Sequence, residues 1–331
     1  MTADATSTVA TALAQAASTA GLAPSVHNTQ PWRWVVLPDR LDLRAEPDRR
    51  LPATDPDGRL STLSCGTALH HARVALAAEG WPARVDRFPD PAEEELLATI
   101  TVGDRTPAPA ETMRLVQCMR VRHTDRRPVS DQPVPAEALA ALTAAVEAEG
   151  TRVQLLADEQ VLALASAASR AQEAESEDPQ VIEELRYWTG RAAEGVGINP
   201  EVLPERPAET TVPGRDFGRP GTLPIGPGHD RSAVYAVLYG DEDEPENWLR
   251  AGEALSAAWL TATERGVSVV PLSGVVEVIS TREALRRSLA NLGYPYLVLR
   301  LGIADPAHAG PPHTPRLPAD QLIDTSAVRE R

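Results

Sequence analysis

Residues 23–37 read APSVHNTQPWRWVVL, a polar loop that leads directly into an apolar run. An alanine-rich stretch at 6–20 precedes it, with Gly21 placed to end a helix. The run at 33–37 is rich in β-branched and aromatic residues, which favours a strand. Loop 24–32 between them carries hydroxyl, amide, imidazole and indole groups, a set that suits a planar polar heterocycle. A turn whose amides bond to its own backbone explains the loop equally well.

The composition is that of a globular chain with a large acidic excess. The 331 residues are 42% hydrophobic and 24% charged, and the formal net charge is −15. This charge disfavours nucleic acid and anionic membranes as partners. The 32 basic residues are all arginines, which excludes chemistry that needs a lysine amine, such as a Schiff base or the P-loop lysine. Arginine suits phosphate, because its guanidinium contacts two oxygens at once.

A second motif, RVRHTDRRP at 120–128, gathers four arginines within eight residues. Arg122, Thr124 and Arg126 alternate, so in an extended segment they face the same side. Two guanidinium groups and a hydroxyl on one side form a phosphate clamp. A solvated basic strand that pairs with the abundant carboxylates is an equally good explanation.

The turn PLSG at 271–274 follows the predicted strand VSVV, and its glycine permits a ligand to approach the backbone closely. On its own this signal is weak, since any tight turn looks the same. His70 and His71 are neighbours on a helix, so we expect one to be buried and the other to lie near solvent, with no metal site. Cys65 and Cys118 lie far apart and predict two buried thiols in a reducing compartment.

Two parts of the chain show the same order of predicted elements. Helices at 61–80 and 248–266 end at Gly80 and Gly266, and two strands follow each. This order predicts an α+β fold of two repeated halves, although chance recurrence remains an alternative. The expected strands are 83–88, 97–102, 233–239, 267–272 and 296–303, and further helices are expected at 135–149, 159–175 and 179–189.

Residues 195–228 contain seven prolines and seven glycines, so they exclude a regular helix or a central strand. Such a long irregular segment is usually functional or disordered. Arg206, Arg215, Phe217 and Arg219 favour a lid that packs over a site rather than a linker. The few apolar residues predict that its contacts are marginal, with Phe217 as the anchor. The N-terminus has neither a signal peptide nor a membrane span, which predicts a cytoplasmic protein.

Together, PSVHNTQPW, SCGTALHHARVAL, RHTDRRPV, VSVVPLSG and PRLP resemble the FMN-dependent nitroreductase family, and more narrowly its Acg-type branch. In that branch a fused chain imitates the usual dimer. The resemblance implies that Arg122 holds the FMN phosphate and that Arg126 lies near flavin N1 and the C2 carbonyl. It also implies that the 271–274 turn approaches N5 through its backbone. The implied cofactor-binding residues are Pro24, Ser25, Val26, Asn28, Gln30, Arg122, Thr124, Arg126, Pro271, Leu272, Ser273, Gly274 and Arg316.

The implied function is an oxidoreductase that transfers hydride from NAD(P)H through FMN to a small acceptor such as a nitroaromatic or a quinone. No catalytic side chain and no metal are required, because the flavin carries the chemistry. The alternatives are an FMN-sequestering protein with a closed lid and, more weakly, a non-catalytic scaffold. Each motif occurs once, so we expect one FMN between the halves 1–110 and 111–331, and a monomer.

Overall fold

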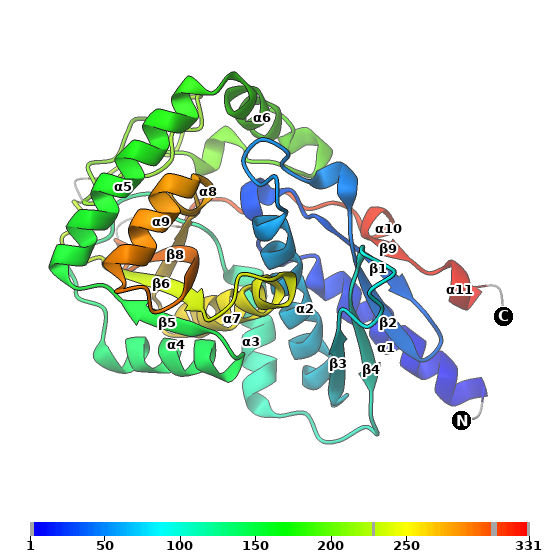
Figure 1. Cartoon of the computed structure of the whole chain (residues 1–331). Coiled ribbons are helices and arrows are strands. Elements are labelled where there is room, and N and C mark those ends of the chain that lie inside the picture. The colour runs from blue at the N-terminus through cyan, green and yellow to red at the C-terminus, as the bar shows by residue number, and fades with distance from the viewer. Residues whose placement is uncertain (1–2, 227–228, 306–309, 330–331) are drawn as a thin grey trace.

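The computed structural model describes residues 3–226, 229–305 and 310–329, and it confirms the α+β class. Two sheets lie on opposite sides of a central pair of helices (Figure 1). The first sheet has the order β3 (Ala83–Arg87), β4 (Leu96–Val102), β2 (Arg40–Ala45), β1 (Trp32–Val36) and β9 (Ile323–Asp324). The second has the order β5 (Arg152–Leu155), β6 (Val234–Gly240), β8 (Tyr294–Gly302) and β7 (Ser268–Leu272). All pairs are antiparallel except β1 with β9.

The central helices are α2 (Arg59–Ala78) and α7 (Pro245–Glu264). Their backbones touch where two glycines meet, because a Cβ on Gly66 would lie 2.0 Å from Leu249 O and one on Gly252 would lie 1.9 Å from Leu63 O. Most residues of both helices are buried, as expected for helices covered on all sides. The glycines therefore set how close the two halves of the molecule come.

The remaining helices pack around the central pair and the two sheets (Figure 1). In α6 the side chain of Asp178 accepts hydrogen bonds from the first turn and a proline occupies the first helical position, which explains where this helix begins. The helices are α1 (Ala3–Ala20), α3 (Ala110–Val121), α4 (Ala136–Ala148), α5 (Asp158–Glu177), α6 (Pro179–Thr189), α8 (Gly274–Glu277), α9 (Ile279–Ser288), α10 (Ala319–Leu322) and α11 (Ser326–Arg329). None of the described helices is both long and apolar enough to cross a membrane.

The two sheets share a strand order. The order β3-β4-β2-β1 in the first sheet corresponds by sequence position to β7-β8-β6-β5 in the second. The contact residues Leu63 and Gly66 on α2 precede Leu249 and Gly252 on α7 by the same interval that separates Gly80 from Gly266. The helices also exchange leucines, since Leu60 and Leu63 of α2 belong to the hydrophobic core around α7 and Leu249 of α7 belongs to the core around α1 and α2. The duplication itself stays a prediction.

The C-terminal part of the chain returns to the first sheet. Residues 310–322 run back along the molecule, and β9 then pairs in parallel with β1 through Trp34 and Val35. Figure 1 shows this arm in red, reaching from the second half to the first. If the halves are divided at residue 110, strand β9 of the second half therefore forms an edge of the first sheet.

Candidate functional site

A cavity of about 710 Å³ opens at the junction of the two halves. Loop 24–32, α2, the segment after α3, α5, residues 198–220, the β7–α8 turn and the C-terminal arm all contribute to its walls. The structure brings together residues from the three sequence motifs and the arm. The predicted residues that line the cavity are Pro24, Ser25, Val26, Asn28, Arg122, Thr124, Arg126, Pro271, Leu272, Ser273, Gly274 and Arg316.

Gln30 does not line the cavity but connects the segments that form its walls. The side chain is fully buried, its Nε2 donates to Gly195 O at 2.8 Å, and its Oε1 accepts from the backbone N–H of Leu317 at 3.0 Å. One amide thus joins loop 24–32 to the start of the proline-rich segment and to the C-terminal arm. We assign Gln30 a positioning role in place of the expected cofactor contact.

Loop 24–32 holds three non-glycine residues in the left-handed region of backbone space. The φ angles are 47° at His27, 55° at Asn28 and 51° at Gln30. Such angles cost free energy and persist only where surrounding contacts determine them. Ser25 Oγ accepts from the N–H of Gln30 at 2.9 Å, and the N–H of Val26 donates to Ser64 Oγ on α2 at 3.0 Å. The loop is therefore both a self-bonded turn and a wall of the cavity.

Asn28 connects the same three segments from the cavity side. Its Nδ2 donates to Gly197 O at 3.0 Å and to Pro315 O at 2.9 Å. Its Oδ1 accepts from Nη1 of Arg316 at 3.0 Å. The amide thereby orients the guanidinium of the C-terminal arm toward the cavity that Arg316 lines.

Arg122, which is buried, and Arg316, which is half-buried, are cations without a carboxylate partner among the described residues. Arg122 is 5% exposed, its guanidinium lies 4.5 Å from the centre of the Trp259 ring, and one N–H contacts Leu22 O. Burial and the charge of Arg316 lower the pKa of Arg122 to about 9, and burial lowers that of Arg316 to about 10. The Nε atoms of both are buried without a hydrogen-bond partner. Two uncompensated cations at one end of a cavity are poised for a dianionic ligand.

Arg126 lies further along the same wall. Its Nη1 donates to Val202 O at 3.3 Å, and its guanidinium lies 5.4 Å from the centre of the Phe217 ring. Burial and the charge of Arg300 lower its pKa to about 10. Arg300 itself is paired with Asp230 at 2.9 Å, so Arg126 is the less compensated of these two cations.

The β7–α8 turn is approached closely by protein side chains. A Cβ on Gly274 would lie 3.0 Å from Glu175 Oε1 and 3.2 Å from Arg215 Nη2. Nη2 of Arg215 donates to Glu175 Oε1 at 2.5 Å and to Glu277 Oε2, while Nη1 contacts Nε2 of His27 at 2.8 Å. We call Arg215, Glu175, Glu277 and His27 the Arg215 cluster. The glycine gives room for this cluster as well as for a ligand.

The proline-rich segment is anchored more firmly than the sequence predicts. Buried apolar side chains along it pack against α6 and the neighbouring loops. The two ends of the segment's distal part meet at a neck formed by Leu203, Pro204 and Leu223, where an isolated β-bridge pairs Pro204 with Leu223. The backbones are so close there that a Cβ on Gly221 would lie 1.8 Å from Leu203 O. The expectation of marginal contacts is therefore wrong for residues 195–226, and 227–228 lie outside the described residues. The buried apolar residues are Val196, Ile198, Val202, Leu203, Val212, Phe217 and Leu223.

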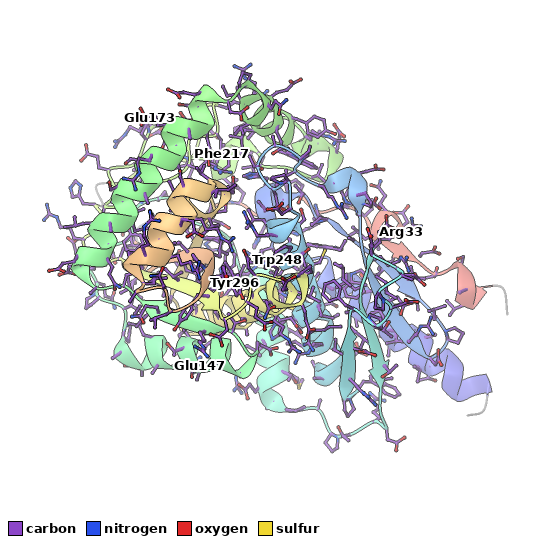
Figure 2. All side chains as sticks on the ribbon, viewed as in Figure 1. Arg33, Glu147, Glu173, Phe217, Trp248 and Tyr296 are labelled. Carbon is purple, nitrogen blue, oxygen red and sulfur yellow. The ribbon has the colours of Figure 1, made fainter. Side chains whose placement is uncertain are left out.

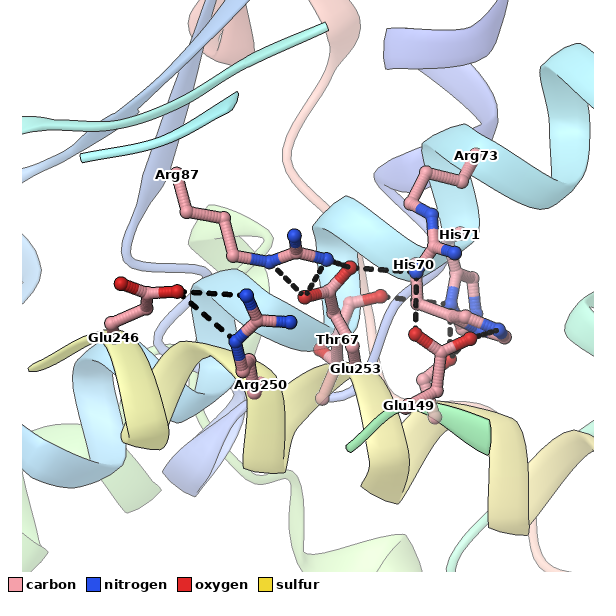
Figure 3. A network of polar contacts seen from close by, with 10 residues as sticks. Thr67, His70, His71, Arg73, Arg87, Glu149, Glu246, Arg250 and Glu253 are labelled. Carbon is pink, nitrogen blue, oxygen red and sulfur yellow. Dashed lines mark hydrogen bonds and ion pairs between the residues drawn. The ribbon is translucent and has the colours of Figure 1, made fainter. Parts of the chain in front are cut away.

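Both adjacent histidines of α2 are buried, so the expectation that one lies near solvent is wrong. His70 and His71 each contact Oγ of Ser256 on α7 through Nδ1, at 2.8 and 2.9 Å. Figure 3 shows that these polar contacts continue from His70 to Glu149, and from there through Arg73 to Glu253, which also pairs with Arg87. The reason is that α7 and α3 cover two faces of α2, which leaves neither histidine a route to water. Burial lowers the pKa of both, to about 4 for His70.

Both cysteines are free and buried, as predicted. Cys65 Sγ lies 3.2 Å from Pro31 O, and burial raises the pKa of its thiol to about 12. Neither thiol is among the residues that line the cavity.

Sequence reasoning missed three contributors to the site, Glu175, His27 and Trp259. Glu175 and Trp259 lie on helices with no local motif, and their proximity follows only from the packing of α5 and α7. His27 was visible inside loop 24–32, but its contact with Arg215 joins residues 188 positions apart.

Comparison with known proteins identifies relatives over almost the full length, although no family model matches. A Mycobacterium tuberculosis H37Rv protein with the name "Putative NAD(P)H nitroreductase Rv3131" is 40% identical over 308 residues, 91% of this chain and 88% of that protein. Another from the same strain, "Putative NAD(P)H nitroreductase acg", is 35% identical over 315 residues, 93% of this chain and 94% of that protein. Among solved structures, the FMN and NADPH-dependent nitroreductase NfnB from Sphigopyxis sp. strain HMH covers 63% of this chain and 97% of its own, with 18% identity and a TM-score of 0.42. By its identity to the curated relatives over more than nine tenths of its length, the chain belongs to the nitroreductase family, in its Acg-type branch.

Proposed function

We propose that this protein is an FMN-dependent NAD(P)H oxidoreductase that reduces a small organic acceptor. The observation that carries the proposal is the group of arginines, one buried and two half-buried, on one wall of the cavity. Arg122, Arg126 and Arg316 have lowered pKa values and no carboxylate partner among the described residues. The names of the curated relatives support the same activity.

The residues present fit FMN. Arg122 and Arg316 each keep a buried Nε–H without a partner, and two cations close together match the charge of a phosphate monoester. Arg126 stands further along the wall, next to loop 24–32 and to Val202. The cavity of about 710 Å³ is within the range of cofactor sites. Arg122 and Arg316 would hold the phosphate, while loop 24–32 and the β7–α8 turn would line the ring.

Bound FMN supplies two-electron chemistry, taking a hydride equivalent at N5 and passing it on. Arg126 would hold positive charge beside the part of the bound ring where negative charge develops on reduction, which would favour reduction. Asn28 and Gln30 fix the geometry of the loop and of Arg316 before any ligand binds, because each bonds to two other segments. The segment that contains Phe217 covers the cavity and limits the entry of water.

Anaerobic titration of purified holoprotein with NADH and NADPH tests this proposal. We expect the flavin absorbance to bleach with at least one of the two donors, and menadione or nitrofurazone to restore it. Arg126→Gln should lower the flavin reduction potential, whereas Arg120→Gln, at an exposed position on α3, should leave it unchanged. Flavin that neither donor reduces would contradict the proposal.

A second candidate function, an FMN store with little turnover, is favoured by one observation. Phe217 is 9% exposed and packs edge-on against His27, while Arg215 is held by two carboxylates. A segment fixed in this way over a bound flavin would exclude nicotinamide and acceptors alike.

Removing the distal part of the segment separates the two functions. The neck formed by Leu203, Pro204 and Leu223 lets a short Gly-Ser linker replace residues 206–219. FMN release should quicken in either case. For an enzyme, the intact protein turns over with menadione, and the deletion, which also removes Arg215, does not raise that turnover. For a store, the intact protein is nearly inert and the deletion raises turnover by roughly tenfold or more.

A further inference from the structure

The Arg215 cluster places two buried carboxylates on one cation inside the cavity. Glu175 comes from α5, Glu277 from α8, and Arg215 from the proline-rich segment. The relative exposures of the Glu175 and Glu277 side chains are 9% and 2%. The carboxylates outnumber the cation, so a fully ionised cluster carries a net negative charge out of water.

A single proton removes that uncompensated charge. Two carboxylates in one buried site repel each other, so the charge of Glu277 favours a proton on Glu175. Glu277 Oε1 is moreover buried without a hydrogen-bond partner, which leaves its charge poorly compensated. Burial and the charge of Glu277 raise the pKa of Glu175 above its ordinary value, against the opposing effect of Arg215.

Two further titratable groups lie beside the pair, His27 and Asp55. Nε2 of His27 lies 2.8 Å from Nη1 of Arg215 and accepts its hydrogen bond, and burial together with the charges of Arg215 and Arg126 lowers the pKa of His27 far below its ordinary value. On the far side of Glu277, Asp55 accepts hydrogen bonds from the N–H groups of Leu60 and Ser61. Asp55 adds a further negative charge near Glu277. Burial together with the charge of Glu277 raises the pKa of Asp55 to about 6.

Of the two carboxylates, Glu175 is the one that faces the reaction space. Glu175, Arg215 and Gly274 line the large cavity, whereas Glu277 lines a small separate pocket of about 10 Å³. A proton on the pair therefore reaches a molecule in the cavity through Glu175. Arg215 and the glycine at 274 hold that carboxyl beside the β7–α8 turn.

We propose that Glu175 is the catalytic acid that protonates the acceptor, with a proton that it shares with Glu277 beside the guanidinium of Arg215. The inference rests on the proposed function, which supplies the electrons. For a quinone, one hydrogen arrives with the electron pair as hydride from reduced FMN, and the O–H bond of Glu175 breaks as a new O–H bond forms on the quinone oxygen. The quinone becomes a hydroquinone, and Glu175 is left as a carboxylate that regains a proton from solvent.

The test compares an acceptor that needs a proton with one that does not. Holoprotein reduced with dithionite is mixed with menadione or with ferricyanide, which takes only electrons. In Glu175→Gln we expect oxidation by menadione to slow roughly a hundredfold and oxidation by ferricyanide to stay within about twofold of wild type. Glu173→Gln, on the exposed face of α5 (Figure 2), is the matched control and should change neither rate. An unchanged menadione rate, or equal slowing with both acceptors, would overturn the proposal.

Two further measurements separate a proton donor from a merely structural carboxylate. Glu277→Gln removes the like charge, so the pH at which the menadione rate declines should move downward, and an unchanged pH profile contradicts the shared proton. Infrared difference spectra of the apoprotein between pH 5 and pH 8 should show carboxyl bands of Asp55 and of Glu175, and Glu175→Gln should remove its own band while that of Asp55 remains. Dithionite and the apoprotein spectra make these tests independent of NAD(P)H, so a failure of the proposed function remains distinguishable from a failure of Glu175.

Discussion

At the scale of single residues, the cavity is organised by charges that the protein itself leaves unpaired. Arg122 and Arg316 lack acidic partners among the described residues, although the chain has 47 acidic side chains to offer. Buried cations of this kind destabilise a fold until a ligand neutralises them. The apoprotein therefore holds an electrostatic strain that an anionic ligand relieves, which is a common cost of a preorganised site.

Arg122→Met should separate ligand affinity from stability. Without the cation, FMN binding should weaken by roughly 2–5 kcal/mol, because a buried charge-assisted contact to phosphate is lost. Riboflavin, which has no phosphate, should bind both proteins nearly equally. The thermal midpoint of the apoprotein should stay level or rise. Arg120→Met, at an exposed position, is the control, and equal weakening of FMN and riboflavin would show that Arg122 acts structurally.

His70 should make stability fall as the solution becomes acidic. Its pKa is about 4 in the folded protein, where burial lowers it, against about 6.5 when unfolded. Between these values the unfolded chain binds a proton that the folded chain does not, so stability present above pH 6.5 is lost as pH falls toward 4. Between pH 7 and pH 5 the loss of stability in urea unfolding should be about 2 kcal/mol smaller in His70→Gln than in wild type, while His27 and His71, whose pKa values burial also lowers, add the same loss to both proteins. Equal losses in both proteins would contradict this assignment.

At the scale of elements, the sequence predicted those whose signal is local. The helices at α4, α5 and α6 begin and end within two residues of their predicted limits, because periodicity and capping residues mark them. Strand β2 was not predicted, although Arg40–Ala45 alternates charged and apolar residues, a pattern that is typical of a strand. The motifs of the site were predicted because their residues are close together in the sequence. Glu175 was not predicted, because only the packing of its helix brings it to Arg215.

The crossing of α2 and α7 should tolerate no added methyl group. In Gly66→Ala the new Cβ would meet Leu249 O at 2.0 Å, a backbone atom that moves only with the whole helix. We expect a loss of roughly 3 kcal/mol or more in the free energy of unfolding, at the upper end of overpacking effects. Gly214→Ala, where nothing lies within 4 Å, is the control. Equal melting temperatures for the two variants would show that the helices separate at little cost.

At the scale of the whole molecule, one chain brings together the parts that form the cavity. Loop 24–32 comes from the first half, Arg122–Arg126 and the β7–α8 turn from the second, and Arg316 from the arm that carries β9 back to β1. The first sheet is thus completed by the same chain that builds the second. A site of this composition needs no residue from another molecule.

This arrangement predicts one FMN per chain and a monomer. Loop 24–32 and the Arg122–Arg126 motif each occur once in the sequence, so a second site related by the shared strand order would lack both the ring-lining loop and the phosphate arginines. Flavin extraction with protein quantitation should give a ratio near one, and light scattering should give a mass near 35.5 kDa. Apoprotein reconstituted with excess FMN is the control for incomplete loading. Two flavins per chain, or an obligate species of twice that mass, would mean that a second copy supplies the missing parts.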